Sequence, residues 1–130
     1  SNELNVGASN LPEYTLSCYS DASHTIYINL EHLENDSVEE VLNSCCHEAY
    51  HGYQHRLVDA YNESSEENQR LRIYRNVVYY IEEFGDYADG YEDFCSYYSQ
   101  RCEMDARAYA EDAVVDYYSR IDEYLSSEVD

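Results

Sequence analysis

The chain has 130 residues and a mass of 15.2 kDa, the size of one domain. All seven basic residues are arginine, and with 28 acidic residues they leave a net charge of −21. Such a surface repels the phosphates of nucleic acids and of anionic membranes, and no apolar stretch is long enough to span a bilayer. We therefore expect no nucleic-acid partner and no membrane contact by this segment. Metal ions and peptides, above all basic peptides, are the partners that this charge attracts.

The composition lies near that of a disordered chain, because aliphatic residues are few and the net charge is high. Seventeen tyrosines change this expectation, since each can bury a large ring if its hydroxyl reaches water or a partner. The sequence therefore predicts a folded domain with a tyrosine-rich, partly hydrated core and modest stability.

The five cysteines are Cys18, Cys45, Cys46, Cys95 and Cys102. They show no zinc-ribbon spacing, so we expect small buried hydrophobes, and the sequence leaves their disulfide state open. Ser1-Asn2 is typical of a cloning remnant, so we expect a part of a longer protein. The acidic, lysine-free composition leans weakly toward an extracytoplasmic location, secreted or at the cell surface, over a cytoplasmic one. The oligomeric state is left open.

The N-terminal third is predicted to contain the β structure. Residues 1–13 are polar and turn-rich and are expected to be a loose lead-in. Residues 14–19 alternate in polarity and residues 25–29 are β-branched and aromatic, so two strands are predicted. The turn residues at 20–23 would join these strands into a hairpin.

Three helices are predicted after the hairpin. The first begins at a cap formed by Asp36 or Ser37 and runs to about residue 61, the second covers roughly 66–84, and the third runs from about 91 to 125. The apolar stripe expected on the first helix is Val38, Leu42, Cys45, Ala49 and Tyr53. The stripe expected on the third is Cys95, Cys102, Ala106, Ala110, Ala113 and Tyr117. The predicted fold class is α+β, mostly α: one domain over residues 1–130, with a short N-terminal hairpin or small sheet packed on a three-helix core.

The first predicted helix carries His47-Glu48-Ala49-Tyr50-His51, an H-E-x-x-H motif. Histidines four residues apart lie one turn apart on the same helix face, so both imidazoles can share one tetrahedral zinc. Glu48 stands beside the first histidine, near enough to take a proton from a zinc-activated water. The motif falls opposite the expected apolar stripe, where purely structural histidines are less expected. We predict His47 and His51 as ligands of one zinc per chain, with Glu48 as the general base.

A catalytic zinc needs a third protein ligand, and the third predicted helix offers Glu103. This residue lies at the edge of the expected buried stripe, where a carboxylate needs a partner because an unpaired buried charge is costly. The alternative is a surface acid paired with Arg107 four residues later. Asp105, at the other edge of the stripe, is the second choice as ligand. His55 lies one turn beyond His51 and is expected at the rim of the site, where it supports a ligand, faces substrate or is simply solvated.

The pair H-E-A-Y-H at 47–51 and E-M-D-A at 103–106 resembles the zinc metallopeptidases of the gluzincin type, over roughly residues 25–110. Small anti-repressor proteases with a later E-x-x-A pattern are similar. The resemblance implies a zincin-like fold, zinc ligands at His47, His51 and Glu103, and hydrolysis of peptide bonds with Glu48 as the base.

The resemblance also concerns the surroundings of the metal. It implies that Thr25–Asn29 is the sheet edge over the cleft, to which an extended substrate adds as a further strand. In the family an acid often stands four residues after the ligand glutamate, and here that position is Arg107. The family's donor to the transition state, a tyrosine or histidine, is sought among Tyr98, Tyr109 and His55.

Two other classes of protein compete with a peptidase. A ferritin-like di-iron site requires a second E-x-x-H, and Ala106 stands three residues after Glu103, so the pattern fails. A non-catalytic zinc-binding acidic interaction module, as part of a longer protein, is the alternative that stays open. A purely structural zinc has no need of Glu48 beside its ligands, so the sequence favours the peptidase.

Overall fold

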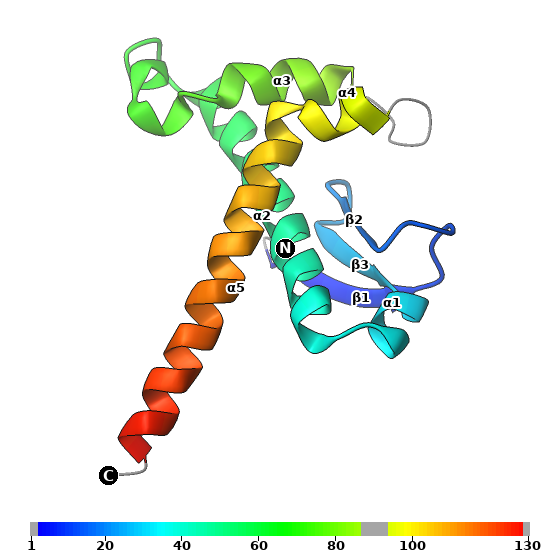
Figure 1. The fold of residues 1–130 in the computed structure, drawn as a ribbon. Helices are drawn as coiled ribbons and strands as arrows, with labels where there is room; N and C mark the ends of the chain where they lie inside the picture. Colours follow the sequence, from blue (N-terminus) through cyan, green and yellow to red (C-terminus); the bar gives the residue numbers. More distant parts are fainter. Residues whose placement is uncertain (1–2, 87–93, 129–130) are drawn as a thin grey trace.

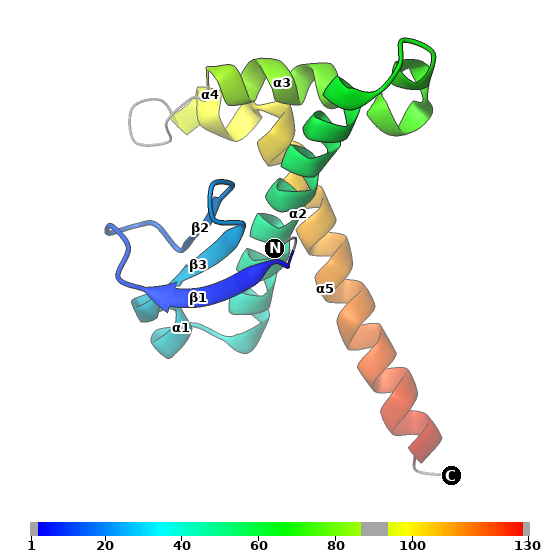
Figure 2. The same cartoon turned by 180° about the vertical axis from the view of Figure 1, so that it is seen from behind.

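The computed structural model describes residues 3–86 and 94–128 and has a mostly helical α+β fold (Figure 1). Two long helices, α2 (Val38–Glu63) and α5 (Arg101–Glu128), cross each other, and a small three-stranded sheet packs against α2 on the side away from α5. Seen from behind, the second half of α5 extends away from every other element (Figure 2). The predicted fold class is therefore confirmed at the level of α+β, mostly α, with a small sheet on helices.

The sheet has the strand order β1-β3-β2. β2 (Ser17–Ser20) and β3 (Thr25–Asn29) are antiparallel, so the predicted hairpin is confirmed. The predicted loose lead-in is wrong in part, because β1 (Asn5–Ser9) pairs in parallel with β3. This pairing makes Thr25–Asn29 the central strand and not an edge. The edge strand next to α2 is β2, because residues of β2 and of α2 line the same cavity.

A polar clamp holds the short helix α1 (Leu30–Asn35) against α2. His32 is 2% exposed, and its Nδ1 lies 2.6 Å from Oδ2 of Asp36 while its Nε2 lies 2.9 Å from Oγ of Ser44. Because α1 follows β3 directly, this clamp also fixes the end of the sheet relative to the start of α2.

Helix α2 begins directly after Ser37, one of the two capping residues predicted from the sequence. The Oγ of Ser37 accepts a hydrogen bond from the backbone N–H of Glu40. The negative charges of Glu39 and Glu40 in the first turn interact favourably with the helix dipole. The predicted apolar stripe is wrong: Val38 is 78% exposed and Tyr53 43%. The buried residues of α2 are Ser44, Glu48, Gly52, Gln54 and Leu57. The helix thus has a polar buried surface that carries the H-E-x-x-H motif, because the sheet packs on one side of it and α5 on the other.

The predicted helix over 66–84 is only half formed. Its first part consists of two 3₁₀ turns, Asn68–Arg70 and Arg72–Tyr74, and α3 begins at Val77 and ends at Gly85. The first turn is tied back to α2, since Nε2 of Gln69 donates to the backbone oxygen of Tyr61 (2.9 Å). This stretch therefore packs against the end of α2 and does not form a continuous α-helix.

The third predicted helix is divided into α4 (Phe94–Ser99) and α5. The carboxylate of Glu83, on α3, accepts the backbone N–H groups of Arg101 (2.6 Å) and Cys102 (2.8 Å), and so caps a new helix start at Gln100. The expected start at residue 91 lies outside the described residues. At the other end α5 runs three residues past the predicted end at 125.

The buried stripe of α5 agrees with the prediction in its first half. Cys102, Ala106 and Ala110 are fully buried, but Val114 replaces Ala113 as the next contact and Tyr117 is 48% exposed. The side chain of Cys95 lies outside the described part. The helix leaves the body of the protein after Val114, so within the described part of the chain the residues further along are almost all exposed.

The main apolar cluster joins α2, α3 and α5 through Leu57, Val77, Tyr80 and Cys102. Among the described tyrosines only Tyr80 is buried, while Tyr61 and Tyr74 are partly buried against this cluster and other rings lie half-buried or exposed. The prediction of a tyrosine-rich core is therefore correct only in part. Cys18, Cys45, Cys46 and Cys102 are free thiols, and of these only Cys102 is buried. Within the described ranges, the helices are all too short or too polar to cross a bilayer.

Candidate metal centre

The crossing of α2 and α5 brings the two motif histidines together with Glu103. Nε2 of His47 lies 3.1 Å from Oε1 of Glu103, and Nε2 of His51 lies 2.9 Å from Oε2. The two Nε2 atoms are 3.2 Å apart. The three residues predicted as metal ligands thus converge, with one nitrogen or oxygen atom from each within 4.8 Å of the others.

The three side chains are largely withdrawn from solvent. The exposed fraction of the side chain is 1% for Glu103, 12% for His51 and 17% for His47. Ala106 and Ala110, both fully buried, follow Glu103 on the same side of α5 and allow the two helices to approach closely. A carboxylate buried to this degree requires a positive partner, and two imidazoles face it.

Gln54 determines which nitrogen of His51 carries a proton. Its Nε2 donates to the backbone oxygen of Cys102 (3.0 Å), so its Oε1 must be the atom that faces Nδ1 of His51 at 2.8 Å. An amide oxygen accepts only, and Nδ1 of His51 is therefore protonated. In the neutral imidazole this leaves the lone pair on Nε2, directed at His47 and Glu103. This is the tautomer that a metal ligand at Nε2 requires.

The lone pair of His51 Nε2 and the carboxylate of Glu103 repel each other unless a cation lies between them. Burial lowers the pKa of His51, but the hydrogen bond and the charge of Glu103 outweigh burial, and the pKa is raised above its ordinary value. Without a metal, the favoured cation at this point is a proton on His51. A divalent ion among the same three atoms would supply the charge in its place.

The spacing of the donor atoms fits a zinc site. Ligand atoms at the corners of a tetrahedron, about 2.0–2.1 Å from zinc, lie roughly 3.3 Å apart. The two Nε2 atoms, 3.2 Å apart, are close to that value, and each lies against its own oxygen of Glu103, His47 at 3.1 Å from Oε1 and His51 at 2.9 Å from Oε2. Two histidines and one glutamate are also a ligand set of catalytic zinc sites.

Glu48 lies next to this cluster and is held by the sheet. Its carboxylate is buried, with the residue 7% exposed, and Oε2 accepts a hydrogen bond from Oγ of Ser17 on β2 at 2.7 Å. The hydroxyl of Ser17 occupies one oxygen of the carboxylate only. The residue predicted as the base is thus held by a hydrogen bond from the strand.

A cavity of about 390 Å³ opens beside Glu48 and His51. Its walls are formed by Ser17, Cys18, Tyr19, Glu48, His51, His55, Phe84 and Tyr97. His55 stacks on Phe84 with ring centroids 4.0 Å apart and lies 3.7 Å from the carboxylate of Asp21. The prediction that His55 lies near the site and faces the space beside it agrees with this position.

The other candidates from the sequence lie outside the cluster. The hydroxyl of Tyr80 and Nδ2 of Asn76 donate to Oδ2 of Asp105, the second choice as ligand, so this carboxylate faces α3. Arg107 donates to the backbone oxygen of Tyr98 and lies over its ring, and does not pair with Glu103. The alternative of an Arg107–Glu103 surface pair is therefore wrong.

The two tyrosines named as transition-state donors do not line the cavity. Tyr98 is bound to Arg107, and Tyr109 stacks on Tyr50 of α2 with centroids 4.8 Å apart. Among the described residues, Tyr19 and Tyr97 are the tyrosines at the cavity wall, and the hydroxyl of Tyr19 contacts Nδ1 of His24 at 2.7 Å. Of the three donors expected from the sequence, only His55 lies beside the site.

Sequence reasoning missed Gln54, Ser17 and Tyr19. One signal for Gln54 exists: a residue three positions after a ligand histidine on a helix lies within reach of its free ring nitrogen. Ser17 and Tyr19 carry no such signal, because their approach depends on how the hairpin packs on α2. Gly52 permits that approach, since a β-carbon there would lie 3.3 Å from Cε1 of Tyr19.

Fold and site together define a small helical α+β protein with a buried His-His-Glu cluster, a neighbouring carboxylate and an adjoining cavity. Comparisons with protein families, with curated proteins and with solved structures found no match. What the cluster does must therefore be argued from its own chemistry.

Proposed function

We propose that this chain is a zinc-dependent peptidase domain of the zincin-like type, with His47, His51 and Glu103 as metal ligands and Glu48 as general base. The observation that carries the proposal is the convergence of two imidazole Nε2 atoms and one buried carboxylate beside a second, separately held carboxylate. A structural metal site needs the first three groups only. The fourth, Glu48, is the group that hydrolysis needs.

Zinc in this site would polarise a water molecule and a substrate carbonyl. Glu48 accepts the proton of the attacking water and later delivers it to the leaving amine. Ser17 orients the carboxylate of Glu48 by donating a hydrogen bond to Oε2, and Oε1 is the oxygen proposed to take the proton. Gln54 keeps His51 in the tautomer that leaves Nε2 free for the metal.

The substrate is proposed to be an extended peptide lying along β2. This strand borders the cavity through Ser17, Cys18 and Tyr19, and its partner β3 lies on its other side. An extended chain could hydrogen-bond to the free edge and place its carbonyl beside Glu48. With a net charge of −21, basic peptides would meet the protein faster than acidic ones.

The same three ligand types also hold ferrous iron in oxygenases, and in a non-catalytic interaction module they would hold zinc for structure only. Elemental analysis separates zinc from iron. We expect one zinc per chain in the parent protein, and none in His47→Ala or Glu103→Gln. Asp105→Asn is the matched control, because it alters a carboxylate two residues away on α5 that contacts α3 instead. Equal zinc in Glu103→Gln and the parent would remove Glu103 from the ligand set.

The peptidase and the interaction module differ in the role of Glu48. Glu48→Gln should keep its zinc and lose hydrolysis of casein and of a basic peptide library by about 10²–10⁴-fold, the usual contribution of a general base. A Glu48→Gln variant as active as the parent would refute the assignment of the base. A zinc-loaded parent that cleaves none of these substrates would instead favour the non-catalytic module.

A further inference from the structure

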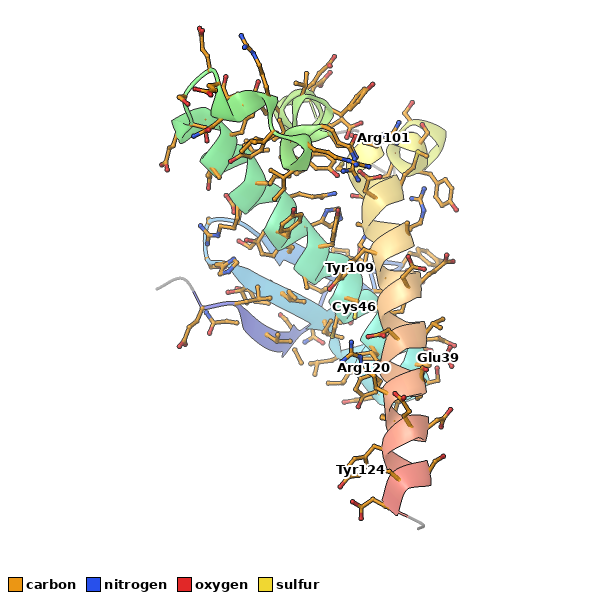
Figure 3. All side chains as sticks on the ribbon, turned by 90° about the vertical axis from the view of Figure 1, so that its left-hand side faces the viewer. Glu39, Cys46, Arg101, Tyr109, Arg120 and Tyr124 are labelled. Carbon is orange, nitrogen blue, oxygen red and sulfur yellow. The ribbon has the colours of Figure 1, made fainter. Side chains whose placement is uncertain are left out.

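The last fourteen described residues of α5 form an arm, residues 115–128, that projects from the body of the protein (Figures 1 and 2). Every residue of the arm is exposed except Ile121, which is half-buried. Figure 3 shows Tyr124 and Arg120 on this part of the helix. The arm therefore gains almost no stability from tertiary packing.

One side of the arm is nevertheless apolar. Tyr117, Tyr118, Ile121, Tyr124 and Leu125 follow Val114 at intervals of three, four, seven, ten and eleven residues, the spacing of one helix face. Val114 is 6% exposed, whereas Leu125 is 54% and Tyr124 63% exposed. These five residues are called the arm face below. They continue the side of α5 that Ala110 and Val114 bury against the body, but here nothing within the described residues covers it.

The arm as a whole is acidic. The arm carries Asp116, Asp122, Glu123 and Glu128 against one base, Arg120, and that base is paired with Asp116 at 2.8 Å. An isolated helix of about 12–15 residues is only marginally stable in water. An amphipathic helix packed on the arm face would supply the missing contacts, and its charge must be positive to lie beside these acids.

We propose that the arm face binds a cationic amphipathic helix of a partner protein. The aliphatic and aromatic side chains of the arm face pack against the partner's apolar face, as in helix-in-groove and coiled-coil pairs. The partner's lysines or arginines lie beside Asp122 and Glu128. The site is distinct from the metal centre and does not depend on the proposed peptidase activity.

A second copy of this chain is a poorer occupant. Two arms side by side would bring eight acids and two arginines together, and each whole chain carries a charge of −21. Like charges along a helix pair disfavour association and are a common means of excluding wrong partners. Charge therefore selects a basic partner over self-association.

The test uses the full chain and three synthetic peptides of three heptads each. The first has isoleucine and leucine on one face and lysine at the flanking positions, the second has glutamate in place of lysine, and the third has the composition of the first in scrambled order. By fluorescence anisotropy we expect the first to bind at least tenfold more tightly than either of the others. Helicity measured by circular dichroism should exceed the sum of the separate components.

Two variants locate the binding on the arm face. Ile121→Ser/Leu125→Ser should weaken binding of the lysine peptide at least tenfold. Val115→Ser is the matched control, because Val115 is 70% exposed on the same arm but off the arm face, and it should change binding less than twofold. All these residues lie outside the buried core, and circular dichroism checks that each variant folds.

Equal affinity of the scrambled peptide, or of the Ile121→Ser/Leu125→Ser variant, would mean that charge alone attracts the peptide and would overturn the proposal. Sedimentation of the parent at neutral pH and low salt should show a monomer. A dimer that this double variant abolishes would assign the arm face to a second copy and would equally overturn it.

Discussion

Replacing Gln54 tests how the candidate metal centre is held together. Gln54 is fully buried and joins Nδ1 of His51 to the backbone oxygen of Cys102. Gln54→Leu removes both hydrogen bonds, and each group left unpaired costs about 1–3 kcal/mol of the free energy of unfolding. Because the variant no longer fixes the tautomer of His51, zinc affinity should also fall about 10–100-fold.

Gln54→Glu separates the two effects. A carboxylate still accepts the proton of His51 Nδ1 but donates nothing to Cys102, so we expect zinc affinity within a few-fold of the parent and a lowered free energy of unfolding. Gln100→Leu is the matched control, since Gln100 is also buried but its amide donates to the backbone oxygen of Tyr97. This control should leave zinc affinity unchanged.

Two measurements give the result. Competition with a fluorescent zinc chelator gives the dissociation constant, and urea unfolding of the metal-free protein gives the stability. The ¹⁵N chemical shifts of His51 report its tautomer directly. If Gln54→Leu lost stability but bound zinc as tightly as the parent, Gln54 would be a packing residue only, and our reasoning on the tautomer would be refuted.

Three further predictions concern the surroundings of the centre. Burial lowers the pKa of His55 even though Asp21 opposes it, so the stability gained from neutral His55 is complete above the unfolded pKa of about 6.5 and is lost as the pH falls through the lower folded pKa. In urea unfolding, His55→Phe should therefore gain stability relative to the parent as the pH falls from 7.5 to 5. Parallel pH curves for the two proteins would contradict this. Ser17→Ala should lower the free energy of unfolding by about 1–3 kcal/mol, because a buried oxygen of Glu48 loses its hydrogen-bond donor. Ser17→Thr keeps the hydroxyl and should not lower it. Equal losses in the two variants would mean that the hydroxyl is immaterial. Zinc at 100 times its dissociation constant should add about 2.7 kcal/mol to the free energy of unfolding, and EDTA should remove this gain. An equal gain in Glu103→Gln would mean that zinc binds elsewhere.

The parts of the fold that the sequence predicts correctly have local signals. The β2–β3 hairpin follows from β-branched runs around a turn, and the start of α2 follows from Ser37 and the acids behind it. β1 has no local signal, because its five residues become a strand only by pairing in parallel with β3. The break between α4 and α5 depends on Glu83, a residue of another helix, and could not be read from the residues around the break.

The candidate site divides in the same way. The helix repeat alone places His47 and His51 side by side, and the cost of burying an unpaired acid singles out Glu103. The contacts of Ser17 and Gln54 with the site depend on how β2 and α5 pack on α2. That packing reverses the expected amphipathicity of α2, and hydrophobic periodicity cannot predict a helix whose buried face is polar.

The reversed amphipathicity of α2 is itself an argument for function. Glu48 and Gln54 are buried where apolar side chains would stabilise the fold more, and the buried apolar cluster is small. Among the described residues, each buried side-chain nitrogen or oxygen still has a hydrogen-bond partner. A fully paired polar interior is at best close to neutral for stability, so stability does not explain why this face is polar. A centre whose ligands must be dry, oriented and close to a second carboxylate does explain it, because those requirements can be met only by groups that the fold encloses.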